Sequence, residues 1–214
     1  MTNFLRTQKL SVDEIVRELF DFSKLGAVSI PDIITEEARE MLKGSFRLAQ
    51  DLFEDAQREE GQVIQEMKIL YIESLPDPSK LPPELRLALE GLQEEYSDFY
   101  RRLSERAGFT SDKFNSIGIH FYPRGSSGIT PHRDYARDVN LIANFIIQGN
   151  TPFFACKNRS KDGSVELDST PGSLILMRAP RSKEELEYRP FHYVLPVKED
   201  RYTVLIRNRT NLKK

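Results

Sequence analysis

The chain has 214 residues, a formal net charge of -2 and one cysteine, Cys156, which cannot form an internal disulfide. A chain of this length buries about 70% of its unfolded surface, so it can build a core without disulfides, and we expect a cytoplasmic protein. The sequence has no signal-like leader, no run of about 20 apolar residues and no clustered basic charge, which argues against secretion, a membrane span and non-specific nucleic-acid binding.

The first 110 residues carry the pattern of helices. Ser11 and Glu14 have the form of a capping box ahead of apolar residues at helical spacing, which predicts a helix over 11–25. Thr35 is the expected N-cap of a longer helix that runs to about Arg58 and stops at Gly61. A third helix is predicted by an apolar stripe: Leu85, Leu89, Leu92, Tyr96 and Phe99.

The rest of the chain reads as short strands separated by turn residues, a spacing that favours a sandwich or barrel. The strands predicted there cover 116–123, 139–148, 152–157, 172–178, 191–197 and 201–208, and two further short strands, 27–30 and 67–72, are predicted in the first half. The proline-rich stretch 76–83 is expected to be a loop. The apolar runs on either side of Gly149-Asn150 predict a β-hairpin. Helices before and strands after residue 110 together indicate an α+β protein.

Two of the three histidines stand where other polar groups could complete a metal site. His132 and Asp134 are two residues apart, and in an extended segment such residues point to the same face about 6.6 Å apart. His192 lies in a later predicted strand and can supply a third ligand. Two imidazoles and one carboxylate leave positions of an octahedral ion open, which is typical of non-haem Fe(II) oxygenases. The alternative for His132 and Asp134 is an ordinary surface loop.

Arg201 and Thr203 lie on one face of the last predicted strand, nine and eleven residues after His192. An arginine buried on a sheet needs an anion, and its planar fork can hold a carboxylate bidentately while the Thr203 hydroxyl donates a further hydrogen bond. These two residues therefore indicate a dicarboxylate pocket. The alternative is an edge-strand arginine that faces water.

In these motifs the sequence resembles the Fe(II)/2-oxoglutarate dioxygenases, over about residues 114–209 with a looser match at 25–35. That family combines a His-x-Asp, a distal His and an Arg-x-Ser/Thr. Features of its AlkB-like branch are also present: His120-Phe-Tyr122-Pro-Arg-Gly125, Ile129-Thr-Pro-His132-Arg-Asp134, and Arg207 six residues after Arg201. The departure is His120, where AlkB-like proteins usually carry Asn.

The resemblance implies one domain over 1–214, in which a double-stranded β-helix, or jelly roll, over 111–214 is supported and roofed by the mainly helical 1–110. It implies that Fe(II) is bound by His132, Asp134 and His192. The co-substrate 2-oxoglutarate would be bound by Arg201 and Thr203, with Tyr122 and Arg207 as further candidates, and O₂ would be consumed. His120 either lines the pocket or packs in the core. Halogenases of this superfamily replace the carboxylate ligand with Gly or Ala, so Asp134 favours hydroxylation.

The substrate is the least determined part. We expect the helical half, the loop 76–83 and the segment 178–189 to roof the open end of the jelly roll. The arginines of 178–189 stand among glutamates, which favours a solvated lid whose charges compensate one another. A small-molecule hydroxylase that releases succinate and CO₂ is therefore favoured over an AlkB-like nucleic-acid demethylase. Two further alternatives are a non-catalytic sensor of metal or 2-oxoglutarate and a Zn²⁺-dependent hydrolase.

Overall fold

The structure is a computed structural model that describes residues 3–7, 10–56, 63–75, 77–111 and 113–210. Its larger sheet has seven antiparallel strands in the spatial order β1-β9-β6-β11-β4-β3-β2. Their bounds are β1 Ala27–Ile30, β2 Glu54–Asp55, β3 Lys68–Tyr71, β4 Ser116–Tyr122, β6 Asp138–Gln148, β9 Leu174–Arg178 and β11 Arg201–Arg209. Three of these strands, β1, β2 and β3, come from the helical first half of the chain.

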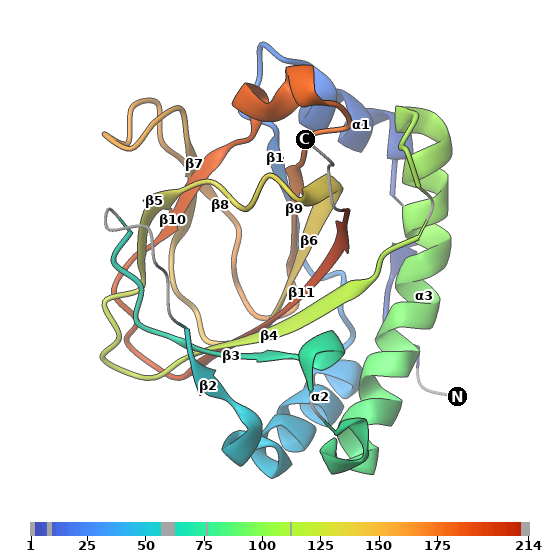
Figure 1. The fold of residues 1–214 in the computed structure, drawn as a ribbon, viewed down its shortest axis with the longest axis vertical. Coiled ribbons are helices and arrows are strands. Elements are labelled where there is room, and N and C mark those ends of the chain that lie inside the picture. Colours follow the sequence, from blue (N-terminus) through green and yellow to red (C-terminus); the bar gives the residue numbers. More distant parts are fainter. Residues whose placement is uncertain (1–2, 8–9, 57–62, 76, 112, 211–214) are drawn as a thin grey trace.

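The smaller sheet faces the larger one and has four antiparallel strands in the order β5-β10-β7-β8. Their bounds are β5 Ile129–His132, β7 Phe153–Cys156, β8 Val165–Leu167 and β10 Phe191–Val194. The chain passes repeatedly from one sheet to the other, which gives the double-stranded β-helix of an α+β protein. Figure 1 shows the smaller sheet on the side of the molecule away from the helices.

Three α-helices pack on the outer face of the larger sheet (Figure 1). They are α1 Val12–Phe20, α2 Glu36–Leu48 and α3 Pro83–Ala107, with 3-10 turns at Gln50–Leu52, Ile72–Ser74, Pro78–Lys80 and Lys183–Tyr188. As predicted, the hydroxyls of Ser11 and Thr35 cap α1 and α2 by accepting hydrogen bonds from the third following backbone N–H. Within the described residues, no helix has the length and apolar character needed to cross a bilayer.

The two faces of the larger sheet belong to separate apolar clusters. On β6, Leu141, Ala143, Phe145 and Ile147 pack toward the helices, whereas Ile142 and Ile146 pack toward the smaller sheet. Both faces are buried, which explains why β6 and β9 read as continuous apolar runs rather than as alternating ones. The inner face of this sheet lines the cavity that lies between the two sheets.

Two helix predictions were too long. The predicted helix 11–25 ends at Phe20, because Asp21 turns extended and its carboxylate accepts the backbone N–H of Ser23 at 2.9 Å, a local bond that competes with the helix. The predicted helix 35–58 ends at Leu48, since the chain then turns to place β2 on the sheet edge beside β3. Its expected stop at Gly61 lies outside the described residues.

The predicted hairpin around Gly149-Asn150 is wrong. β6 pairs with β9 and β11 in the larger sheet, whereas β7 pairs with β8 and β10 in the smaller one. The turn therefore carries the chain between sheets. Gly149 has φ +86°, and a Cβ there would lie 2.8 Å from the Arg201 backbone, so this crossing needs a glycine.

Candidate metal centre and cavity

The two candidate metal histidines face each other on neighbouring strands of the smaller sheet. His132 on β5 is the direct cross-strand partner of His192 on β10, and their ring centroids are 4.2 Å apart. Asp134 lies just beyond the end of β5, with its Oδ2 at 3.6 Å from His192 Nε2. One ligand atom from each of the three residues lies within 4.8 Å of the other two. A single ion between them would contact all three.

Residues behind this triad hold its side chains in place. His132 Nδ1 lies 2.9 Å from the carbonyl oxygen of Thr130, a contact that directs the other ring nitrogen, Nε2, toward the triad. The ring of His192 stacks on Phe153 with centroids 5.5 Å apart and planes at 12°. Arg189 Nη1 donates to the Asp134 carbonyl at 2.7 Å, which anchors the loop after β5. Sequence reasoning missed all three, because no short motif links them to the ligands.

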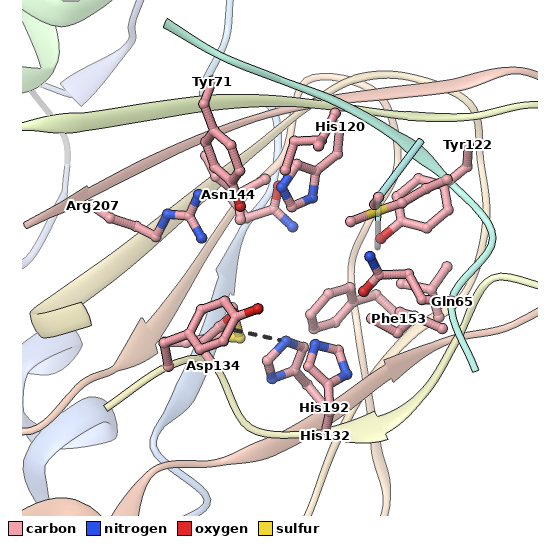
Figure 2. Close-up of a pocket in the computed structure, with 18 of the residues that line it drawn as sticks. Gln65, Tyr71, His120, Tyr122, His132, Asp134, Asn144, Phe153, His192 and Arg207 are labelled. Atoms are coloured by element: carbon pink, nitrogen blue, oxygen red, sulfur yellow. Dashed lines mark ion pairs between the residues drawn. The ribbon is translucent and has the colours of Figure 1, made fainter. Parts of the chain in front are cut away.

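The triad forms one wall of a cavity of about 760 Å³ between the two sheets. Figure 2 shows His132 and His192 on one side, with His120, Tyr122 and Arg207 across from them. His120 is buried and also lines the cavity, so it combines the two roles that the sequence left open. Lining residues that sequence reasoning missed include Gln65, Tyr71 and Asn144. Asn144 had a usable signal, because it is the one polar residue in the apolar run 141–147.

Arg201 begins β11, a central strand, and its side chain is 0% exposed, which rules out the water-facing alternative. Its Nη1 donates to the carbonyls of Gly149 and Thr151 at 3.2 and 3.1 Å. Its Nε and Nη2 are buried and have no hydrogen-bond partner among the described residues. Arg201 does not itself line the cavity, but Tyr122, its cross-strand partner on β4, does.

The charge of Arg201 is costly where it lies. Burial lowers the pKa of Arg201 to about 10, and the neighbouring Tyr122 acts in the opposite direction. The guanidinium is still protonated at neutral pH. A buried cation with two unused donors is destabilising unless an anion meets it.

The solved structures that resemble this chain include two prolyl hydroxylases and a carbocyclase. A prolyl-4-hydroxylase from Pseudomonas putida aligns with a TM-score of 0.65 at 13% identity, over 92% of this chain and 99% of its own. A prolyl hydroxylase from Trichoplax adhaerens, in complex with a hypoxia inducible factor peptide, aligns with a TM-score of 0.69 at 16% identity, over 92% and 88%. SnoK, a non-heme alpha-ketoglutarate-dependent carbocyclase from nogalamycin biosynthesis, aligns with a TM-score of 0.64 at 14% identity, over 96% and 86%.

The chain has the fold of these two prolyl hydroxylases and of this carbocyclase. The expected double-stranded β-helix is therefore confirmed. No protein-family model matches the chain, and no curated protein matches its sequence. At 13–16% identity the likeness shows the fold alone.

The donor set of His132, Asp134 and His192 suits an Fe(II) ion. Two imidazoles and one carboxylate on one wall of a cavity can hold a six-coordinate ion and leave its other positions facing the cavity. The buried, unsatisfied donors of Arg201 suit a carboxylate. Both observations fit an Fe(II) and 2-oxoglutarate site.

Two of the three parts of the predicted lid do not line the cavity. Among the described residues that line the cavity, none comes from 77–83 or 178–189. Arg178 is buried, not solvated, because its guanidinium donates to the Leu19 and Tyr188 carbonyls at 3.0 and 2.6 Å and so ties this segment to the end of α1. The first half of the chain, the third part of the predicted roof, does line the cavity, through residues of 53–56 and 65–71.

Proposed function

We propose that this protein is an Fe(II)/2-oxoglutarate-dependent oxygenase that hydroxylates a small molecule. The observation that carries the proposal is the convergence of His132, Asp134 and His192, with ligand atoms within 4.8 Å of one another, on the wall of a cavity. In this proposal these residues bind Fe(II). The retained carboxylate of Asp134 favours hydroxylation over halogenation.

The co-substrate is assigned to the Arg201 end of the inner sheet face. Nε and Nη2 of Arg201 would hold the distal carboxylate of 2-oxoglutarate, with the hydroxyls of Thr203 and Tyr122 as further donors. Thr203 lies two residues from Arg201 on the same strand face, and Tyr122 is the cross-strand partner of Arg201. The carboxylate would neutralise a guanidinium that is otherwise buried without an anion.

When bound, iron and 2-oxoglutarate supply the oxidising chemistry, with O₂ consumed and succinate and CO₂ released. The chain has to fix the ligands, exclude water and aim one C–H bond of the substrate at the metal. The Thr130 and Arg189 contacts hold the ligands in place. Apolar lining residues such as Phe153, Met177 and Leu205 exclude water.

A cavity of about 760 Å³ favours a small-molecule substrate, since pockets of about 300–1,000 Å³ accommodate ligands of that size. An AlkB-like nucleic-acid demethylase would instead need a basic groove with aromatic stacking residues. A sensor would produce no succinate with any substrate. A Zn²⁺-dependent hydrolase would work without O₂ and would have no use for Arg201.

The test is an anaerobic titration of the purified protein with Fe(II) and then 2-oxoglutarate. We expect the weak visible charge-transfer band that chelation of 2-oxoglutarate to Fe(II) produces, followed by succinate formation when O₂ is admitted. Metal-loaded protein that gives neither signal would contradict the proposal.

A second titration tests the role of Arg201. We expect Arg201→Gln to bind Fe(II) as the wild type does. Its affinity for 2-oxoglutarate should fall by about 10–100-fold, because a hydrogen bond to a charged group contributes about 1.5–3 kcal/mol. Arg124→Gln, which removes an exposed arginine near the same end of the sheet, is the matched control. Equal 2-oxoglutarate affinity in both variants would remove Arg201 from the site.

A further inference from the structure

A second buried arginine lies at the far end of the same strand face. Arg207 on β11 is 2% exposed and lines the cavity. It follows Arg201 by six residues, an even number, so the two side chains leave the same face of the sheet. Six strand residues span about 20 Å, several times the length of a five-carbon diacid. We therefore do not expect the distal carboxylate of 2-oxoglutarate to contact both guanidinium groups.

Two of the guanidinium nitrogens of Arg207 have unused donors. Its Nε and Nη2 are buried and have no hydrogen-bond partner among the described residues. Asp138 forms a buried ion pair with Arg207, but its Oδ2 lies 3.8 Å from Arg207 Nη1, beyond hydrogen-bond distance. The other oxygen of Asp138 accepts from Arg209 Nε at 3.0 Å. Asp138 is thus shared between two cations and leaves two Arg207 donors unsatisfied.

The surroundings of Arg207 are shaped to leave its guanidinium in the cavity (Figure 2). Its carbon Cζ lies over the Tyr71 ring at 5.4 Å. A Cβ at Gly118 would lie 3.0 Å from both Arg207 Nη2 and the Tyr71 ring, so this glycine gives both groups room.

We propose that Arg207 binds a carboxylate of the primary substrate, which makes that substrate a small organic acid. This inference rests on the proposed function, which defines the primary substrate as the molecule that shares the cavity with 2-oxoglutarate. The planar fork of arginine matches a carboxylate, and the neighbouring Met177 and Leu205 offer apolar surface to the hydrocarbon part. The alternative is the expectation from the sequence, that Arg207 binds the co-substrate, and the 2-oxoglutarate titration below distinguishes the two.

The test uses the anaerobic Fe(II) protein saturated with 2-oxoglutarate. The probes are benzoate and phenylacetate, each paired with its neutral amide, and binding is followed by ligand-observed NMR. We expect the acids to bind at least about tenfold more tightly than the amides, as loss of a charged hydrogen-bond partner predicts. Phenyl phosphate distinguishes a planar carboxylate site from a general anion site, which would bind it equally well and overturn the assignment to carboxylates.

Variants then assign the preference to Arg207. We expect Arg207→Gln to remove the preference for acids over amides. Arg207→Lys keeps the charge but loses the planar guanidinium, and should reduce the preference from about tenfold to about threefold. Arg137→Gln removes an exposed arginine from the cavity rim and should change acid binding by less than about twofold. If Arg207→Gln is too unstable to purify, Arg207→Lys alone decides, since unchanged acid binding in that variant overturns the proposal.

The same variants distinguish the two ligands. We expect the dissociation constant of 2-oxoglutarate to rise less than about threefold in Arg207→Gln, whereas a rise of tenfold or more would assign Arg207 to the co-substrate and overturn the inference. Failure of the wild type to bind Fe(II) and 2-oxoglutarate at all would overturn the proposed function instead. Acid binding that still depends on Arg207 in that case would leave the anion site standing.

Discussion

Over residues 201–207 the two faces of strand β11 are equally buried, but only the inner face carries buried polar and charged side chains. On the outer face of β11, Tyr202, Val204 and Ile206 pack into the cluster that the helices cover. On the inner face of the same strand, Arg201 and Thr203 alternate with them and are buried as deeply. Exposure therefore does not separate the two faces. What separates them is the partner, which is a helix layer on one side and a cavity on the other.

This difference assigns stability and chemistry to opposite sides of one strand. Apolar side chains on the outer face contribute burial free energy, whereas unsatisfied guanidinium donors on the inner face cost stability until an anion meets them. Successive side chains of a strand point to opposite faces, so β11 can carry apolar residues on one face and polar residues on the other. Substitutions on the cavity side should therefore change binding with little change in folding, and substitutions on the helix side should do the reverse.

The largest effect is expected at the metal wall. Changing a residue behind a metal ligand already costs about 10–100-fold in affinity, so Asp134→Ala, which removes a ligand, should lose Fe(II) binding and succinate formation altogether. Asp134 is the most exposed of the three candidates, with 14% of its side chain accessible, so the variant should fold. Metal binding followed by calorimetry checks this. Asp55→Ala, which removes an exposed carboxylate from the same cavity, should bind Fe(II) normally.

A large effect of the opposite kind is expected on the helix side. Phe145 on β6 is fully buried and meets Tyr96 of α3 edge-to-face, with centroids 5.2 Å apart. Phe145→Ala should lower the free energy of unfolding by about 3–5 kcal/mol, as large-to-small core changes do. Denaturant titration measures this loss. The folded fraction should keep its affinity for Fe(II) and 2-oxoglutarate, and a parallel loss of both would show that the two faces are not independent.

The sequence predicted the second half of the molecule better than the first. Apolar runs such as β6 and β9 are so strongly patterned that their positions were predicted within a few residues. The length of α2 was not predictable, because helix propensity continues past Leu48 and the edge pairing of β2 with β3 overrides it. The hairpin failed for a related reason, since turn residues do not say which sheet the next strand will join.

The candidate site divides in the same way. His132, Asp134 and His192 were found because histidine is rare in this chain and the residue types are those that bind metal. Their convergence depends on the cross-strand register of β5 and β10, which one sequence does not contain. Contacts made through the backbone, such as that of Arg189 with the Asp134 carbonyl, leave no pattern in the sequence. The ligand assignments and the co-substrate role of Arg201 stay predictions until binding is measured.

The smallest effect gives the sharpest comparison, because it uses two adjacent residues of nearly equal shape. Thr203→Val removes a hydroxyl from the cavity side of β11 and should weaken 2-oxoglutarate by about 3–10-fold, the value of one hydrogen bond, with little change in unfolding free energy. Val204→Thr places a hydroxyl among the apolar residues under the helices. It should cost about 1–3 kcal/mol of stability and leave 2-oxoglutarate affinity unchanged.

Each variant is the control for the other, since both exchange a methyl and a hydroxyl on the same strand. Unfolding in denaturant and 2-oxoglutarate titration of the Fe(II) protein are measured for both. A crossed result, in which one variant loses only affinity and the other only stability, would support the separation of the two faces. If instead both variants lost stability equally and neither changed 2-oxoglutarate binding, Thr203 would be a packing residue, and the co-substrate site would have to be built from Arg201 and Tyr122 alone.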